Sequence, residues 1–310
     1  MRKKISLTTS VKASGMAIQQ ESKKIPFEKQ TPVELIQRNP KHQFGNRPDY
    51  YTRRGTSMEG VDSRVLSLEE SYFAGKKVLD IGCHAGIVTL QIAKHYKPAS
   101  IKGIDIDYRL VNEAVRHWTS EDSLAQVEKA RKLESTGKEI NKKLDLLKTF
   151  PKNIKESCPE MASLLGKRDQ QSHSSMDIET EYPHNVSFEI VNILDLDETK
   201  EKTKYDTVVC FSLTKWVHLN YGDEGIKKMF QKIKMCLAWG GLLILEVQKH
   251  KSYIKKIKDF PRFKEIFANI EFLPENFGEY LTKELGFQRV TTLETKNLEE
   301  FKRDVEVYRL

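Results

Sequence analysis

Short apolar runs alternate along the chain with longer segments whose apolar residues recur every three or four positions. In residues 76–96 (KKVLDIGCHAGIVTLQIAKHY), an apolar run ends at Asp80, a glycine-bearing turn follows, and helical spacing then begins. Residues 100–107 (SIKGIDID) and 108–118 (YRLVNEAVRHW) continue with a second strand pattern and a second helix pattern. The order of strand, turn, helix and strand predicts a right-handed parallel unit.

The alternation resumes at residue 186. The runs VSFEIV, YDTVVC and LLILEVQ predict three strands, and the last is apolar enough for the interior of a parallel sheet. Residues 222–241 have the spacing of an amphipathic helix that Gly240 and Gly241 are expected to end. A further helix, a turn at Gly286 and two closing strands follow. The pattern predicts an α/β fold, a doubly wound Rossmann-type sheet of about seven strands.

Two segments do not fit this pattern. Residues 1–40 are polar and basic without sustained periodicity, which predicts a flexible N-terminal arm. Residues 119–185 combine candidate surface helices with a stretch low in apolar residues, which predicts a partly disordered insertion. The folded domain is therefore expected to consist of residues 41–118 and 186–310.

Composition supports long solvated segments around an ordinary core, because only 38% of residues are hydrophobic and the mean hydropathy is −0.56. Lysine and arginine number 52 against 44 aspartate and glutamate residues, which gives a net charge of +8. This excess favours a polyanionic partner. A lysine-rich soluble surface would produce the same balance, so charge alone leaves both interpretations open.

The four cysteines, Cys83, Cys158, Cys210 and Cys236, have no CxxC pairing, so neither structural zinc nor a disulfide framework is expected. Three of them sit in apolar surroundings, as buried thiols of a reducing compartment do. No apolar run has the length of a secretory signal or a membrane span. We expect a soluble intracellular protein without a membrane partner.

The glycine turn suggests a nucleotide-type cofactor. A glycine after the first strand of such a sheet lets the backbone approach a ligand, and an acid after the second, here Asp105, can hold ribose hydroxyls. A dinucleotide site would carry G-x-G-x-x-G, whereas this turn reads D-x-G-C-x-x-G from Asp80 to Gly86. That motif resembles the cofactor turn of S-adenosylmethionine-dependent methyltransferases. Asp107 is either a second ligand contact or a solvated acid at a strand end.

The segment after the fourth predicted strand carries a more specific resemblance. Residues 212–230 (SLTKWVHLNYGDEGIKKMF) resemble the signature of the methylphosphate capping enzymes, also called bicoid-interacting methyltransferases. These enzymes methylate the γ-phosphate at the 5′ end of small RNAs such as 7SK. The motifs FGNRPDYY, RVL, VLDIGC, GIDID and F-x-x-Y-L…GF occur in the family's order. The resemblance covers about residues 41–118 and 186–310, which would form the methyltransferase domain.

The resemblance implies S-adenosylmethionine as cofactor, no metal, and a set of site residues. The implied cofactor contacts are Tyr51, Arg64, Gly82, Cys83, His84, Gly86, Asp105, Ile106, Asn192, Ile193 and Phe211. The implied catalytic residues are Lys215, Tyr50 and His218, and the implied RNA contacts are Arg53, Arg54, Trp216 and Asn220. A terminal phosphate has a second pKa of about 6, so it is already anionic near neutral pH and needs alignment and charge neutralisation rather than a base.

Several of these residues also have a purely structural interpretation. Trp216 is more typical of a packing residue beneath a site than of a base-stacking platform, and His218 is more typical of a hydrogen-bonded structural histidine than of a catalytic one. Arg53 and Arg54 could be a solvated pair, although the neighbouring tyrosines favour RNA contact.

Two departures from the family pattern keep a second function open. His84 stands where the family has asparagine, and EVQKHK (246–251) replaces the family's E-P-Q-P-W. The first hypothesis is an active RNA 5′-phosphate methyltransferase. The second is a catalytically weak RNA-binding subunit that stabilises a small ribonucleoprotein. Under either hypothesis, the resemblance implies a nuclear protein, an RNA with a 5′ triphosphate of the 7SK, U6 or telomerase RNA class, and a La-related protein as partner.

Overall fold

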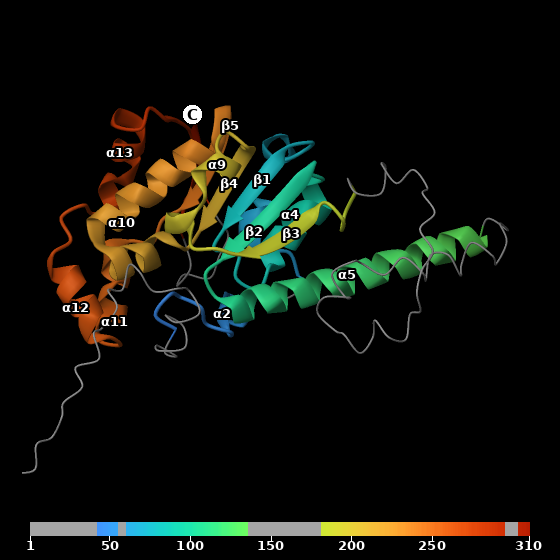
Figure 1. Ribbon diagram of the computed structural model, residues 1–310, viewed down its shortest axis with the longest axis horizontal. Coiled ribbons are helices and arrows are strands. Elements are labelled where there is room, and N and C mark those ends of the chain that lie inside the picture. Colours follow the sequence, from blue (N-terminus) through green and yellow to red (C-terminus); the bar gives the residue numbers. More distant parts are fainter. Residues whose placement is uncertain (1–41, 55–59, 136–180, 295–302) are drawn as a thin grey trace, which may run out of the picture.

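A computed structural model describes residues 42–54, 60–135, 181–294 and 303–310. Seven strands form one sheet in the order β3-β2-β1-β4-β5-β7-β6 (Figure 1). β1 to β5 pair in parallel, while β7 is antiparallel to both β5 and β6. The strands are β1 Lys77–Ile81, β2 Ser100–Asp105, β3 Val186–Ile190, β4 Tyr205–Phe211, β5 Leu237–Glu246, β6 Gln288–Leu293 and β7 Val305–Arg309. The predicted doubly wound α/β fold is confirmed.

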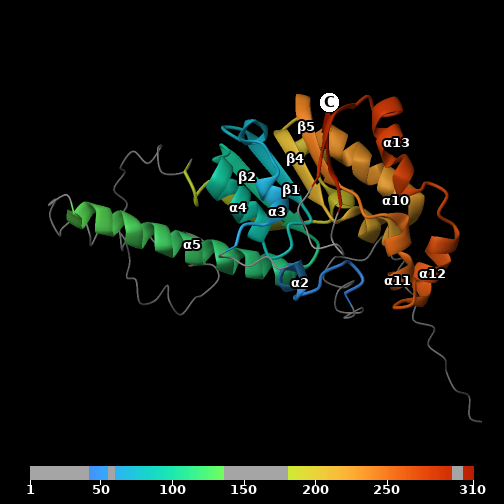
Figure 2. The same cartoon turned by 180° about the vertical axis from the view of Figure 1, so that it is seen from behind.

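Helices cover both faces of the sheet (Figures 1 and 2). They are α2 Tyr50–Arg54, α3 Ser63–Leu66, α4 Ile87–Tyr96, α5 Tyr108–Ser135, α9 Glu198–Glu201, α10 Thr214–Cys236, α11 Ile254–Ile257, α12 Pro261–Ala268 and α13 Phe277–Lys283. Short 3₁₀ turns lie at η2 Glu70–Tyr72, η3 Ile193–Asp195, η4 His250–Ser252 and η5 Pro274–Asn276. None of the described helices combines the length and apolarity needed to cross a membrane.

The core has two layers, because successive strand residues point to opposite faces. Leu79 and Val208 pack in the layer that holds the apolar residues of α10 and α13. Their neighbours Val78 and Val209 pack in the layer that holds α3 and α4. The central strands are buried on both sides, as their continuous apolar runs predicted.

The helix expected to end at Trp118 instead continues to Ser135 as α5, which extends beyond the sheet in Figure 1. Residues 119–135 contain no glycine or proline and are rich in helix-forming residues, so the helix continues although its apolar periodicity fades. The predicted insertion therefore begins inside a helix. Its remainder, residues 136–180, and the predicted arm lie outside the described residues, so both stay predictions.

The boundaries of α10 also differ from the prediction. The helix begins at Thr214, is interrupted at Gly222 (φ 67°, ψ −166°) and ends at Cys236. Gly240 and Gly241 lie within β5 and do not end a helix. A Cβ on Gly241 would lie 2.8 Å from the Ala238 carbonyl oxygen, so this glycine permits an irregular start of the strand beside β4.

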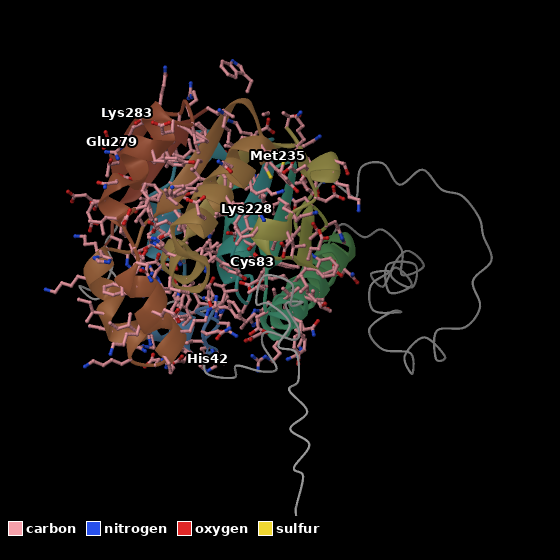
Figure 3. The ribbon with its side chains drawn as sticks, turned by 60° about the vertical axis from the view of Figure 1, so that its left-hand side comes forward. His42, Cys83, Lys228, Met235, Glu279 and Lys283 are labelled. Carbon is pink, nitrogen blue, oxygen red and sulfur yellow. The ribbon has the colours of Figure 1, made fainter. Side chains whose placement is uncertain are left out.

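The strand order fixes where a site can form. β2, β1 and β4 are neighbours, so the turn after Ile81, the acid at Asp105 and the segment after Phe211 meet at one edge of the sheet. Segment 42–54, α11 and α12 lie at this same end (Figures 1 and 2). Figure 3 shows His42 at this end and Glu279 and Lys283 of α13 at the other.

Candidate functional site

Two adjoining cavities open at the carboxyl ends of these strands, and together we call them the strand-end cleft. Their volumes are about 560 and 450 Å³ when the solvent in their mouths is included. They share five lining residues, Phe44, Gly82, Asp105, Leu213 and Trp216. The glycine turn and the start of α10 therefore face each other across one space, as the family signature and cofactor turn predicted.

Nearly all predicted cofactor residues line this cleft. Tyr51, Arg64, Gly82, Cys83, His84, Asp105 and Phe211 line the first cavity, together with Tyr50. Ile106, Asn192 and Ile193 line the second, with Asp105 and Gly82 at the boundary. Among the predicted set, Gly86 lines neither.

Gly86 is a packing residue instead. It is the N-cap of α4 and has a φ of 74°, which favours glycine. A Cβ at this position would lie 2.7 Å from both the Ala114 Cβ and the Phe188 ring. Gly86 therefore lets α4 lie close to its neighbours, and its contribution to the cleft is indirect.

Replacing Gly86 with alanine should lower the free energy of unfolding by more than replacing Gly240, whose φ of 76° is nearly the same but which has nothing within 4 Å of an added Cβ. In both variants, alanine in the left-handed backbone region lowers the free energy of unfolding by about 1–2 kcal/mol. Only Gly86→Ala adds overpacking, about 1–3 kcal/mol more. Urea denaturation of both variants measures the difference, and equal losses would contradict the packing role.

The backbone of the glycine turn is tied to the second strand. The amides of Gly82 and Cys83 donate to the Ile104 carbonyl at 2.8 and 3.0 Å, and the His84 amide donates to Asp105 Oδ2 at 2.9 Å. Burial raises the pKa of Asp105 to about 6, so it is mostly ionised at neutral pH. A carboxylate has about four lone-pair sites, so Asp105 can accept further hydrogen bonds from hydroxyl groups in the cleft.

Segment 42–54 closes one side of the cleft through contacts with three elements. Asn46 Nδ2 donates to Asp107 Oδ2 at 2.5 Å, and Asn220 Nδ2 donates to the Gln43 carbonyl at 2.9 Å. His84 Nε2 donates to the Arg47 carbonyl at 2.8 Å. Asp107 is buried and bonded within the protein, so it is not the solvated strand-end acid that was the alternative, and it lines neither cavity of the cleft. Asn220 is likewise buried and holds this segment instead of facing outward.

A buried ion cluster lies behind the cleft. Arg64 pairs with Asp62 at 2.8 Å and with Glu246 at 3.2 Å. Arg54 pairs with the same two acids at 3.9 and 3.6 Å, and Arg303 lies 3.7 Å from Glu246. Burial would raise the pKa of Glu246, but the three guanidinium groups hold it below its usual value. Arg54 thus faces inward, and only Arg53 of the predicted arginine pair faces the outer cavity described next.

A third and larger cavity, the cation cavity, adjoins the cleft and has a volume of about 1370 Å³ with its solvent. Its charged lining residues are Arg47, Arg53, Lys215, Lys249, Lys251, Lys255, Lys256 and Arg303. No aspartate or glutamate is among the described residues that line it. It meets the first cavity of the cleft at Gly45, Tyr50, Ser212 and Trp216. The predicted residues Lys215, Tyr50, Arg53 and Trp216 therefore all line the cation cavity, and Tyr50 and Trp216 lie at its junction with the cleft.

Lys215 is 8% exposed, and its Nζ lies 4.9 Å from the centre of the Trp216 ring. Burial, followed by the positive charges of Arg303, Lys256 and Lys255, lowers the pKa of Lys215 to about 7. The ammonium group is therefore poorly solvated and surrounded by like charges. An anion in the cation cavity would relieve both penalties.

His218 is not brought to the junction. It is fully buried, its Nε2 donates to Asp223 Oδ1 at 2.7 Å, and its Nδ1 lies 3.3 Å from the Tyr253 hydroxyl. It lines neither the strand-end cleft nor the cation cavity. This geometry is that of the hydrogen-bonded structural histidine.

Sequence reasoning missed Glu246, Gln248 and Arg303. Gln248 Oε1 accepts from the Thr214 hydroxyl at 2.7 Å and from the Lys215 amide at 3.1 Å, and its Nε2 donates to the Ser212 carbonyl. Glu246 and Gln248 are the two residues of the family's E-P-Q-P-W that EVQKHK retains. Glu246 could have been found from the sequence, because it is an acid at the end of an apolar strand, where sites form. No sequence signal marked Arg303.

Within the described ranges, no group of three or more histidine, cysteine, aspartate or glutamate side chains could hold a metal ion. The described cysteines, Cys83, Cys210 and Cys236, are free and buried, and Figure 3 shows Cys83 in the interior of the molecule.

Residues 205–310 match the family model of bicoid-interacting protein 3, and residues 60–149 match a methyltransferase small domain. A mouse 7SK snRNA methylphosphate capping enzyme is 38% identical over 83% of this chain and 39% of its own length. The corresponding human enzyme is 37% identical over 80% of this chain and 36% of its own length. The chain thus spans less than half of these two relatives.

An Arabidopsis thaliana protein named "Probable RNA methyltransferase" is 32% identical over 81% of this chain and 74% of its own length. Among solved structures, the magnesium protoporphyrin IX methyltransferase of Synechocystis PCC 6803 with bound SAM aligns over 90% of this chain and 96% of that one, at 16% identity and a TM-score of 0.46. The fold class rests on the strand order and not on that structural similarity. The relatives and the bicoid-interacting signature agree: this chain belongs to the methylphosphate capping enzyme family, the bicoid-interacting methyltransferases.

Proposed function

We propose that this protein is an S-adenosylmethionine-dependent RNA methyltransferase that adds a methyl cap to the 5′ γ-phosphate of a small nuclear-type RNA. The observation that carries the proposal is the junction between the two spaces. A cavity lined by lysine and arginine opens directly beside the strand-end cleft, with Tyr50, Ser212 and Trp216 as common walls. The names of the relatives support it, since those of mouse and fly are 7SK and U6 snRNA methylphosphate capping enzymes.

The residues of the strand-end cleft fit the cofactor. Asp105 can accept hydrogen bonds from ribose hydroxyls, and the apolar side chains of Ile106 and Ile193 suit an adenine ring. The buried cluster has three guanidinium groups and two carboxylates, so the cluster as a whole is positively charged. Arg64 is the member of the cluster that lines the cleft, where it can face a ligand carboxylate. When bound, S-adenosylmethionine supplies an electrophilic methyl group on its sulfonium.

The cation cavity suits a phosphate acceptor. A terminal phosphate oxygen is anionic near pH 7, so the protein need not remove a proton from it. The protein must instead hold the oxygen in line with the methyl group and balance the charge of the neighbouring phosphates. Lys215, Arg53 and Tyr50 line the cavity, and Tyr50 lies at the junction where this alignment is needed.

The two departures from the family pattern are compatible with activity. His84 has a φ of 55°, a region that histidine tolerates, and its ring lies 5.4 and 5.3 Å from those of Tyr50 and Tyr51. Glu246 and Gln248 keep contacts at the junction without the flanking prolines. These contacts favour the active enzyme over the catalytically weak RNA-binding subunit.

The proposal includes an RNA with a 5′ triphosphate, of the 7SK, U6 or telomerase RNA class, and residence in the nucleus. It also includes a La-related protein as a companion in the particle. The 7SK and U6 classes and the nucleus are supported by the names of the snRNA-modifying relatives. The telomerase RNA class and the companion are supported by the family resemblance alone.

The test incubates the protein with methyl-labelled S-adenosylmethionine and a 5′-triphosphate RNA. Label should enter that RNA, should be lost when its 5′ phosphates are removed, and should not enter a matched 5′-hydroxyl RNA. Asp105→Asn, which weakens an acceptor in the cleft, should lower cofactor affinity by about 10-fold or more. Absence of label in the wild-type reaction, with RNA binding retained, would replace this proposal with the RNA-binding subunit.

A further inference from the structure

Arg303 reaches the junction of the two spaces from a distant part of the chain. It precedes β7, yet its Nη1 donates to Ser212 Oγ, just after β4, at 2.9 Å. Ser212 lines both the strand-end cleft and the cation cavity, and Arg303 lines the cation cavity. The Arg303 side chain is 14% exposed, so it is largely desolvated.

Two buried polar side chains, Ser212 and Glu246, hold the Arg303 guanidinium in place. Glu246 is fully buried, accepts from Ser212 Oγ at 2.5 Å and lies 3.7 Å from Arg303 Nη1. Ser212 and Glu246 therefore hold one edge of the guanidinium. An arginine held in this way loses little further side-chain entropy when its planar group binds an anion.

Arg303 is also electrostatically close to Lys215. After burial, its charge is the largest influence that lowers the pKa of Lys215. Two partly desolvated cations at the edge of a cavity whose described lining has no carboxylate repel each other. A multiply charged anion between them would turn this repulsion into two charge-assisted contacts.

We propose that Arg303 binds the acceptor phosphate together with Lys215, and that Ser212 and Glu246 are positioning residues that hold its guanidinium at the junction. This inference rests on the proposed function for the identity of the acceptor. Planar guanidinium groups match phosphate oxygens in pairs, so Arg303 would supply direction where Lys215 supplies a point charge.

The test measures binding of inorganic triphosphate by calorimetry, without cofactor and without RNA. Arg303→Met should weaken binding by about 10- to 100-fold, and Arg303→Lys should fall between Arg303→Met and wild type. The pH at which binding weakens should rise in Arg303→Met, because Lys215 then keeps its proton to higher pH. Arg289→Met is the matched control, since Arg289 pairs with Glu306 and lies outside the cation cavity.

Triphosphate binding by Arg303→Met with wild-type affinity and an unchanged pH midpoint would overturn the inference. Should that variant not fold, Arg303→Lys and Ser212→Ala provide the same comparison with smaller changes, and wild-type affinity in both would overturn it equally. A third outcome separates the two proposals. If Arg303→Met loses triphosphate binding while the wild-type protein binds triphosphate but methylates no RNA, the anion site is upheld and the proposed reaction is rejected.

Discussion

Replacing Lys215 with methionine should lower kcat/KM for 5′-triphosphate RNA by about 100- to 1000-fold, the range observed when one preorganised group that stabilises transition-state charge is removed. Methionine keeps much of the side-chain length and apolar surface against Trp216 but removes the ammonium group. Initial rates of label transfer measure the effect. Lys228→Met is the control, because this exposed lysine lies on the same helix and outside the cavity (Figure 3).

The same lysine predicts a pH dependence. Its pKa is about 7 in the free protein, so it is charged below that pH and neutral above it. A bound phosphate favours the charged form and raises this pKa, so binding takes up a proton and affinity falls as pH rises from 7 to 9. Calorimetry in buffers of different ionisation enthalpy detects the proton. Lys215→Arg should remove this uptake, and a wild-type affinity that stays flat over this range would contradict the assignment.

Replacing Glu246 with glutamine should lower the free energy of unfolding by about 3–5 kcal/mol, because it leaves buried guanidinium groups without a counter-charge. The substitution keeps the shape of the side chain, so the loss reports charge and not a cavity. Arg54 and Arg64 would then share Asp62 as the remaining acid of the cluster, and Arg303 would lose its contact with the Glu246 carboxylate. Denaturation at neutral pH gives the value.

Glu189→Gln is the matched control for Glu246. Glu189 pairs with Lys102 at 2.7 Å, but its side chain is 53% exposed, and exposed pairs contribute about 0–1 kcal/mol. A loss at Glu246 as small as that at Glu189 would mean that the cluster does not depend on this carboxylate.

The fold was predictable from periodicity wherever one element followed another closely. The turn from β1 to α4 and the acid at the end of β2 each depend on a few adjacent residues. The boundaries of α10 were not predictable in this way, because glycine has two uses. Gly222 interrupts the helix, and Gly241 permits a close backbone approach in β5 rather than ending the helix.

The site was predictable as far as sheet topology brings neighbouring strand ends together. That rule placed Gly82, Asp105 and the start of α10 around one space. The ion cluster was beyond it, because Arg64 and Glu246 are separated by 182 positions in sequence. Arg53 and Arg54 show that residue type alone does not predict which side chain faces the cavity. Adjacent residues on a helix point about 100° apart, so one lines the cation cavity and the other enters the core.

The place of β7 has a consequence for synthesis on the ribosome. β7 is translated after β6 but lies between β5 and β6, and β6 pairs only with β7 among the described strands. A nascent chain can therefore assemble the cleft walls on β1, β2 and β4 while the edge of β5 is still open. A premature stop before codon 303 would leave that edge exposed to other chains and prone to aggregation. Such a product would also lack the arginine at the junction, so it would be nearly folded yet without one of the cations of the cation cavity.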